Sequence, residues 1–268
     1  MYSFVFALLN SRLSYKDSLE AYTRYRQNPR EFIESYPKFK EICDDSLPSL
    51  EKEIELTQKL GLCTCLLDDI HYPKFLGECS EAPLLLYSNF MLDPVSQRFI
   101  TIVGSRGCSE IGRQYVREIV EKIAKCYPGY IIVTASVTGI ASEVRTHAAK
   151  LNVPVVTVLG TGFQNMHLYG GALPFTYCIT SHLCVKKPSN YDYIKANSIL
   201  AGISEKVIVV ESGEKSGCID VAKRALDYGH DVYTVFGPNL PESFSGNFAL
   251  VNSNIATDYN NLFPFPIV

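Results

Sequence analysis

The sequence predicts an α/β fold in which helices flank a mainly parallel β-sheet, with a small helical region at the N-terminus. From residue 99 onward, short continuous runs of Val and Ile alternate with amphipathic segments of helical periodicity. This alternation is typical of a parallel sheet that is buried on both faces. Most of the apolar runs also end at a glycine. Ligands bind at the carboxyl ends of the strands in such sheets.

Residues 1–60 are expected to be helical. Ser14 can cap a helix that ends before the break at Asn28-Pro29. The segment Asp45-Ser46-Leu47-Pro48 predicts the start of a longer helix, because proline is favoured in a first helical turn. We therefore expect helices over residues 2–10, 15–26, 29–36 and 45–60.

Residues 61–95 are expected to connect this region to the main sheet. Two short apolar runs, 63–67 and 83–87, are separated by a polar loop. Asp93-Pro94 marks a boundary, because proline disfavours a continuous element there. The main domain is therefore predicted to span residues 96–268.

The main domain is predicted to contain six strands, each bounded by turn or helix signals. The expected strands cover residues 99–103, 130–134, 153–159, 177–181, 207–210 and 232–236. The expected helices cover residues 110–126, 141–151, 191–203 and 218–228.

The first strand of this domain is followed by Gly104-Ser105-Arg106-Gly107 and then by an amphipathic helix. A tight turn of this kind directs backbone N–H groups and the positive end of the helix dipole at the loop. Arg106 adds a permanent cation with a planar set of donors. The sequence therefore predicts a phosphate site at this loop.

Composition limits the kind of protein that this chain can be. A net charge of −3 disfavours a uniformly basic surface, but a local cluster is enough to bind nucleic acid. The nine cysteines are odd in number and scattered, which predicts reduced thiols in a cytoplasmic protein. No apolar run approaches the roughly 20 residues that cross a membrane.

The cations expected near the strand ends are Arg106, Arg113, Lys186, Lys187, Lys195 and Lys215.

Several common ligand motifs are missing from the sequence. The first loop is not G-x-G-x-x-G, and Thr134-Ala135-Ser136 supplies no acid at the end of the second strand, which disfavours NAD or FAD. No P-loop or G-x-S-x-G elbow occurs, and the five histidines have no metal-ligand spacing. We therefore predict no cofactor, no metal and no catalytic residue.

The order of the motifs resembles the DNA-processing protein A (DprA/Smf) family. The Gly-Ser/Thr-Arg loop of that family matches Gly104-Ser105-Arg106, and its later Ser and Gly match Ser109 and Gly112. Weaker matches follow in the same order over about residues 60 to 240. They lie at 134–141, 158–162, 197–204, 209–211, 215–217 and 235–237.

The resemblance implies an extended Rossmann-like fold that binds single-stranded DNA without catalysis. It also implies a cytoplasmic homodimer that hands incoming DNA to the RecA recombinase during natural transformation. The amides and the arginine of the first loop would hold backbone phosphates. The candidate DNA- and phosphate-binding residues are Gly104, Ser105, Arg106, Ser109, Gly139, Gly160, Gly162, Lys195, Asn197, Lys215, Ser216 and Gly217.

The chain departs from the family at one basic segment. The usual Arg-Asn-Arg reads Ala196-Asn197-Ser198, so Lys195 is the cation that remains nearby. Losing two phosphate contacts is expected to weaken DNA binding and to reduce its salt dependence. Tyr191 and Tyr193 could stack on bases or pack against the sheet.

Two other functions remain open from the sequence. The chain could be a nucleotide-binding or nucleotide-cleaving protein similar to the lysine-decarboxylase-like Rossmann group. Glu211, at a strand end, is the best residue for that function, but the group's Pro-Gly-Gly-x-Gly-Thr loop is not in the sequence. The chain could also be a scaffold that has lost its ligands and keeps only protein partners.

Overall fold

A computed structural model describes residues 2–11, 13–168, 177–187 and 192–263 of the chain. Within these residues, nine strands form one sheet in the order β1-β2-β6-β5-β4-β3-β7-β8-β9. The strands are β1 (Cys63–Leu66), β2 (Leu85–Ser88), β3 (Arg98–Val103), β4 (Tyr130–Ala135), β5 (Val155–Val158), β6 (Tyr177–Thr180), β7 (Lys206–Val209), β8 (Asp231–Thr234) and β9 (Thr257–Asp258).

Ten α-helices lie in the described residues. They are α1 (Tyr2–Asn10), α2 (Tyr15–Tyr25), α3 (Pro29–Ser35), α4 (Pro37–Lys59), α5 (Lys74–Gly77), α6 (Glu110–Cys126), α7 (Ile140–Lys150), α8 (Asp192–Gly202), α9 (Gly217–Asp227) and α10 (Ser245–Asn252). Three short 3₁₀ segments, Phe163–Leu168, Glu242–Phe244 and Tyr259–Leu262, complete the regular structure of this part of the chain.

The sheet confirms the predicted fold class. Strands β3 to β6 run in parallel in one direction along the sheet, and β7, β8 and β9 continue in parallel on the other side of β3. The strand order therefore reverses between β3 and β7. That reversal is the topological switch point, where α/β sheets bind their ligands.

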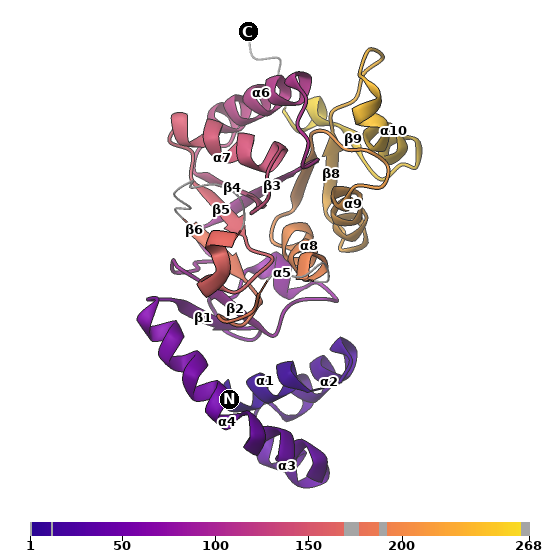
Figure 1. Ribbon diagram of the computed structural model, residues 1–268. Helices are drawn as coiled ribbons and strands as arrows, with labels where there is room; N and C mark the ends of the chain where they lie inside the picture. The colour runs from indigo at the N-terminus through magenta and orange to yellow at the C-terminus, as the bar shows by residue number, and fades with distance from the viewer. Residues whose placement is uncertain (1, 12, 169–176, 188–191, 264–268) are drawn as a thin grey trace.

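Helices cover both faces of the sheet (Figure 1). Val116, Ile119 and Val144 from α6 and α7 share one buried cluster with the sheet, and Leu200 and Val221 from α8 and α9 share another. Continuous apolar strands are needed here, because side chains pointing to either face of a doubly covered sheet are removed from water.

The predicted strands and helices of the main domain lie within two residues of their expected limits, but α10, β9 and the three 3₁₀ segments were not predicted. The prediction for the last N-terminal helix was wrong, because α4 begins at Pro37 and continues through Pro48. Phe39 in its first turns packs edge-on against Phe32, with ring centroids 4.8 Å apart. Pro37, the first residue of α4, is itself a local start signal of the kind expected at Pro48. The contact between Phe39 and Phe32 adds tertiary stabilisation to the first turns.

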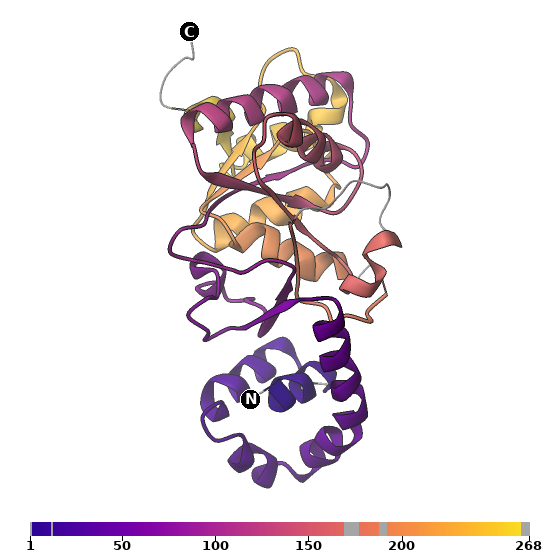
Figure 2. The same cartoon turned by 90° about the vertical axis from the view of Figure 1, so that its left-hand side faces the viewer.

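The N-terminal helices pack against one edge of the sheet (Figure 2). Phe4 and Leu8 of α1 share a buried cluster with Leu85 of β2 and Cys178 of β6. Strand β2 pairs with both β1 and β6, so two strands of segment 61–95 extend the main sheet.

Glu53 connects α4 to the loop that follows β6. Its side chain is only 4% exposed, and its Oε1 accepts a hydrogen bond from the Cys184 amide at 2.6 Å. We expect Glu53→Ala to lower the free energy of unfolding by about 2 kcal/mol, because a buried amide loses its acceptor. Urea unfolding measures this loss. Glu55→Ala, an exposed position on the same helix, should change stability by less than about 0.5 kcal/mol; equal losses would contradict the role given to Glu53.

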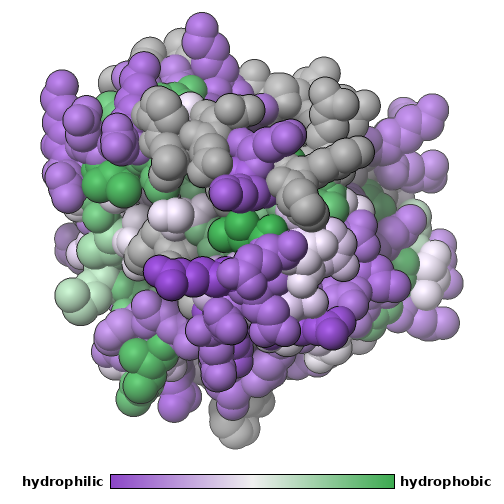
Figure 3. Space-filling view, turned by 90° about the horizontal axis from the view of Figure 1, so that it is seen from below, coloured by the Kyte–Doolittle hydropathy of each residue, from purple (hydrophilic) through white to green (hydrophobic). Residues whose placement is uncertain are grey.

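The surface seen from the N-terminal end is mainly hydrophilic, and its hydrophobic residues form small separate areas (Figure 3). No helix in the described part of the chain is long and apolar enough to cross a membrane. The same residues contain no group of three His, Cys, Asp or Glu side chains placed to hold a metal ion.

Candidate functional site

A cavity of about 330 Å³ lies at the switch point, beside the carboxyl ends of β3 and β4. Its walls are mainly apolar and include Val103, Leu200 and Val221. Polar groups are contributed by a few residues, among them Arg106 and Asn197. An apolar cavity with few, convergent polar groups is typical of a ligand site.

Five of the predicted site residues line this cavity. They are Gly104, Arg106, Asn197, Ser216 and Gly217, from three segments far apart in the chain. Lys215 precedes Ser216 and is exposed. Lys195 is exposed too, but it lines a different cavity of about 450 Å³ beside the N-terminal helices.

The loop after β3 is fixed by the segment after β4. Gly139 has a φ of +76°, and a Cβ atom there would lie 2.2 Å from the Ser105 carbonyl oxygen. The Ile140 amide donates to that same oxygen at 3.0 Å. Only glycine allows this approach, so the backbone of the loop is rigidly positioned while the Arg106 side chain stays exposed.

The N-terminus of α6 differs from the expected open phosphate site. The Ser109 amide and hydroxyl both donate to Oε2 of Glu211, at 3.0 and 3.1 Å, and the Ser105 amide donates to the Glu211 carbonyl at 2.7 Å. The amides of Ser105 and Ser109 are therefore engaged inside the protein. Both amides, which the sequence places in a phosphate site, already have an acceptor within the protein.

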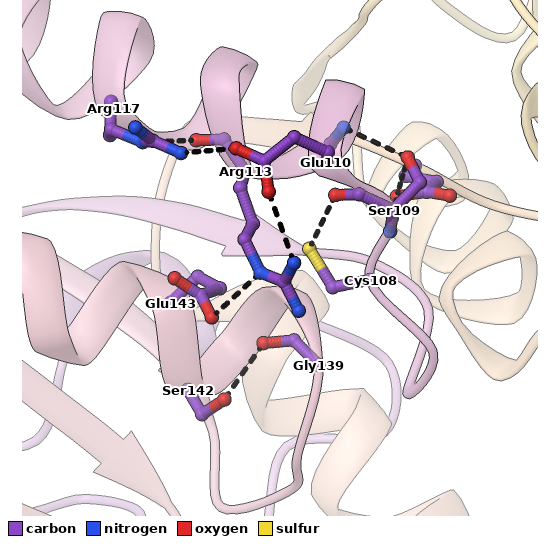
Figure 4. Close-up of polar contacts among 10 residues, drawn as sticks. Cys108, Ser109, Glu110, Arg113, Arg117, Gly139, Ser142 and Glu143 are labelled. Carbon is purple, nitrogen blue, oxygen red and sulfur yellow. Dashed lines mark hydrogen bonds and ion pairs between the residues drawn. The ribbon is translucent and has the colours of Figure 1, made fainter.

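Arg113, counted among the cations near the loop, is paired with acids (Figure 4). Its guanidinium lies 3.2 Å from both Glu110 and Glu143, and Arg117 lies 2.8 Å from Glu110. Hydrogen bonds from Arg113 and Arg117 hold the pKa of Glu110 below its usual value. The first turn of α6 is therefore not a cationic surface, and Arg106 is the cation that the loop itself presents.

Gly160 and Gly162 lie outside the cavity. Both are buried, and a Cβ atom at Gly162 would lie 2.0 Å from the Leu183 carbonyl oxygen. The Gly162 amide donates to the Lys186 carbonyl at 2.9 Å. Gly162 therefore allows a close approach of the protein's own backbone. Neither glycine lines the cavity with the other site residues.

Asn197 lines the cavity and links α8 to α9. Its Nδ2 donates to Asp220 at 3.0 Å, and Asp220 also accepts from Arg224 at 2.9 Å. The neighbouring Ala196 and Ser198, where the family usually has arginines, are both buried. Tyr191 and the side chain of Tyr193 lie outside the described part of the structure.

Arg145 of α7 is a residue that the sequence analysis missed. It is 7% exposed, and its guanidinium donates to the carbonyls of Ala135 and Val137, the latter at 2.9 Å. Burial lowers the pKa of Arg145 to about 10. Since Ala135 and Val137 line the cavity, Arg145 shapes its wall.

The two cysteines near the cavity are protonated thiols at neutral pH. Burial, followed by the nearby Glu211 carboxylate, raises the pKa of Cys108 to about 11. Burial also raises the pKa of Cys218. A thiol is a poor nucleophile compared with its thiolate, so the raised pKa values do not favour either cysteine as a nucleophile.

Fold and site together define a doubly wound α/β protein with an arginine-bearing cavity at its switch point. Residues 64–263 match the family model described as DNA recombination-mediator protein A. The chain belongs to this family.

Individual relatives agree with this assignment. The chain is 28% identical to DNA processing protein DprA of Bacillus subtilis, over 74% of this chain and 68% of that protein. It is 28% identical to DprA of Streptococcus pneumoniae, over 80% of this chain and 73% of the relative. Against protein Smf of Synechocystis, it is 29% identical over 65% of this chain but only 46% of the relative.

Solved structures share the fold. An X-ray structure of DprA from Streptococcus pneumoniae superposes with a TM-score of 0.79 at 22% identity, covering 98% of this chain and 99% of that one. DNA processing protein A from Helicobacter pylori, whose structure was described for its single-stranded DNA binding mode, gives a TM-score of 0.61 at 16% identity. That match covers 75% of this chain and 94% of the other.

Proposed function

We propose that this chain binds single-stranded DNA without catalysis, at the rim of the switch-point cavity. The observation that carries the proposal is the convergence of Arg106, Asn197, Ser216 and Gly217 on one cavity at the carboxyl edge of the sheet. Family membership and the Helicobacter pylori relative, described for single-stranded DNA binding, support the same ligand.

The chemistry of the site suits a flexible polyanion. Arg106 is exposed and can reach phosphate oxygens with paired donors. Exposed Lys215 adds a second cation next to Ser216 and Gly217. The apolar walls of the cavity can receive part of a base or sugar from a strand whose phosphates lie along the rim.

Arg106→Ala tests this proposal directly. We expect its dissociation constant for oligo-dT to rise at least about tenfold, with a salt slope smaller by about one, because one phosphate contact is lost. Fluorescence anisotropy at several salt concentrations measures both quantities. Arg98→Ala is a matched control, because Arg98 is exposed at the amino end of the same strand. Equal binding by both variants and the unmodified chain would contradict the proposal.

The wider role that we propose follows the family. The chain would act as a cytoplasmic homodimer that delivers single-stranded DNA to a RecA-type recombinase during natural transformation. Family membership supports this role. Light scattering of the purified chain, with and without oligo-dT, tests the dimer, and a pull-down with RecA tests the partner.

No observation favours the nucleotide-cleaving alternative. Glu211, the residue on which it depends, is 1% exposed and is hydrogen-bonded to Ser109. A thermal-shift comparison separates the two functions: oligo-dT stabilises a DNA-binding protein, whereas stabilisation by mononucleotides alone would favour the alternative.

A further inference from the structure

The carboxylate of Glu211 lies where an anionic ligand would be expected to bind. Glu211 follows β7, and it reaches the first turn of α6, which follows β3. The N-terminus of a helix after the first strand of such a sheet is a common phosphate site, because amides and the helix dipole both favour an anion there. Here the amide and hydroxyl of Ser109 donate to Glu211 instead.

The surroundings of this carboxylate are built to receive it. Gly112 lies in the first turn of α6, and a Cβ atom there would be 2.0 Å from Oε2 of Glu211. The Gly112 amide donates to the Ser109 hydroxyl at 3.0 Å, and that hydroxyl donates on to Glu211. The chain thus provides both the space and a relay of donors for an internal anion.

This internal anion separates two places where a phosphate could bind. The N-terminus of α6 already holds one negative charge, so a second anion there meets repulsion and finds Ser109 engaged. Arg106, in the same loop, lines the neighbouring cavity and is exposed. Negative ligands are therefore directed to the rim and away from the helix terminus.

We propose that Glu211 is a specificity-determining residue that excludes the terminal phosphates of free nucleotides from the N-terminus of α6. The site then selects a phosphodiester chain that crosses the rim at Arg106. The exclusion itself depends only on the geometry around Glu211, whereas the selection of a DNA strand depends on the proposed function.

Two variants test the exclusion, with inorganic pyrophosphate and ADP as the probes. Glu211→Ala leaves the amide and hydroxyl of Ser109 without their acceptor. Glu211→Gln removes the charge while keeping the shape of the side chain. We expect at least one variant to bind pyrophosphate about tenfold or more tightly than the unmodified chain, measured by isothermal titration calorimetry. Glu211→Gln decides alone if Glu211→Ala does not fold.

The proposal would be overturned if none of the variants that fold gained affinity for either probe. Ser142→Ala serves as a control, because Ser142 donates to the Gly139 carbonyl on the neighbouring helix and does not contact Glu211. Oligo-dT binding by the unmodified chain is measured separately. Its failure would refute the proposed function and would leave the gain of pyrophosphate binding as an independent result.

Discussion

Replacing Gly139 by alanine is expected to lower the free energy of unfolding by about 3 to 5 kcal/mol, through backbone strain and steric overlap together. Gly139 has φ +76° and ψ −134°, a conformation that is essentially confined to glycine. The new Cβ would also lie within 2.4 Å of the carbonyl oxygens of Ser105 and Arg106. The loop that presents Arg106 must then move, so oligo-dT binding should weaken in parallel.

A second glycine provides the control for Gly139. Gly229 has φ +80°, but a Cβ there would meet no atom within 4 Å. Gly229→Ala should therefore cost only about 1 to 2 kcal/mol and leave DNA binding intact. Urea unfolding of both variants gives the comparison. Equal destabilisation would show that packing between the two loops contributes nothing.

Replacing Asn247 by leucine is expected to destabilise the fold by about 3 to 5 kcal/mol, because three buried backbone groups lose their partners. Asn247 has no exposed surface. Its Oδ1 accepts from the Ser212 amide at 2.9 Å, and its Nδ2 donates to the carbonyls of Val210 and Val235 at 2.9 and 3.0 Å. One side chain thus joins α10 to the ends of β7 and β8.

Asn252→Leu on the same helix is the matched control, because Asn252 is exposed. Its effect on the free energy of unfolding should stay below about 0.5 kcal/mol. Thermal unfolding followed by circular dichroism ranks the two variants. A similar small effect at both positions would mean that water or nearby groups replace the Asn247 hydrogen bonds.

The strands and α-helices from β3 to β8 were predicted well because their signals are local. Apolar runs of four to six residues are separated by amphipathic helices and glycines, and each signal lies inside its own element. The α6 limits, Glu110–Cys126, agree with the prediction, since Ser109 is a strong N-cap signal whose side chain accepts from the Gly112 amide. The start of α4 was predicted wrongly because Pro37 and Pro48 offer the same kind of start signal, and the prediction used Pro48, which lies inside the helix.

The site was harder to predict because its contacts join distant segments. Glu211 accepts hydrogen bonds from Ser109, the N-cap of a helix that begins about one hundred positions earlier in the chain. Predicting this contact requires knowing that β3 and β7 are neighbours. The spacing of residues along the sequence does not indicate that β3 and β7 pair. Asn247 was missed for the same reason, since a single asparagine in a helix gives no local sign of its three partners.

A glycine at a strand end can indicate either of two kinds of close backbone contact, and the sequence does not distinguish them. A missing Cβ allows a ligand to approach the backbone, but it equally allows another loop to do so. Gly104 and Gly217 line the cavity, whereas Gly139 and Gly162 lie against carbonyl oxygens of the protein itself. Only the three-dimensional arrangement separates these two uses.

The cluster shared by α1 and the sheet edge has a consequence for cooperativity. The cluster joins residues that are far apart in the sequence, and each shields the others from water. Its members include Phe4, Leu8, Leu85 and Cys178. If the N-terminal helices detached, β2 and β6 would expose apolar side chains beside β1, the edge strand on this side of the described sheet. An exposed apolar sheet edge is prone to pair with other chains. We therefore expect the N-terminal helices and the sheet to unfold in one cooperative transition. The packed helices also protect the sheet from self-association.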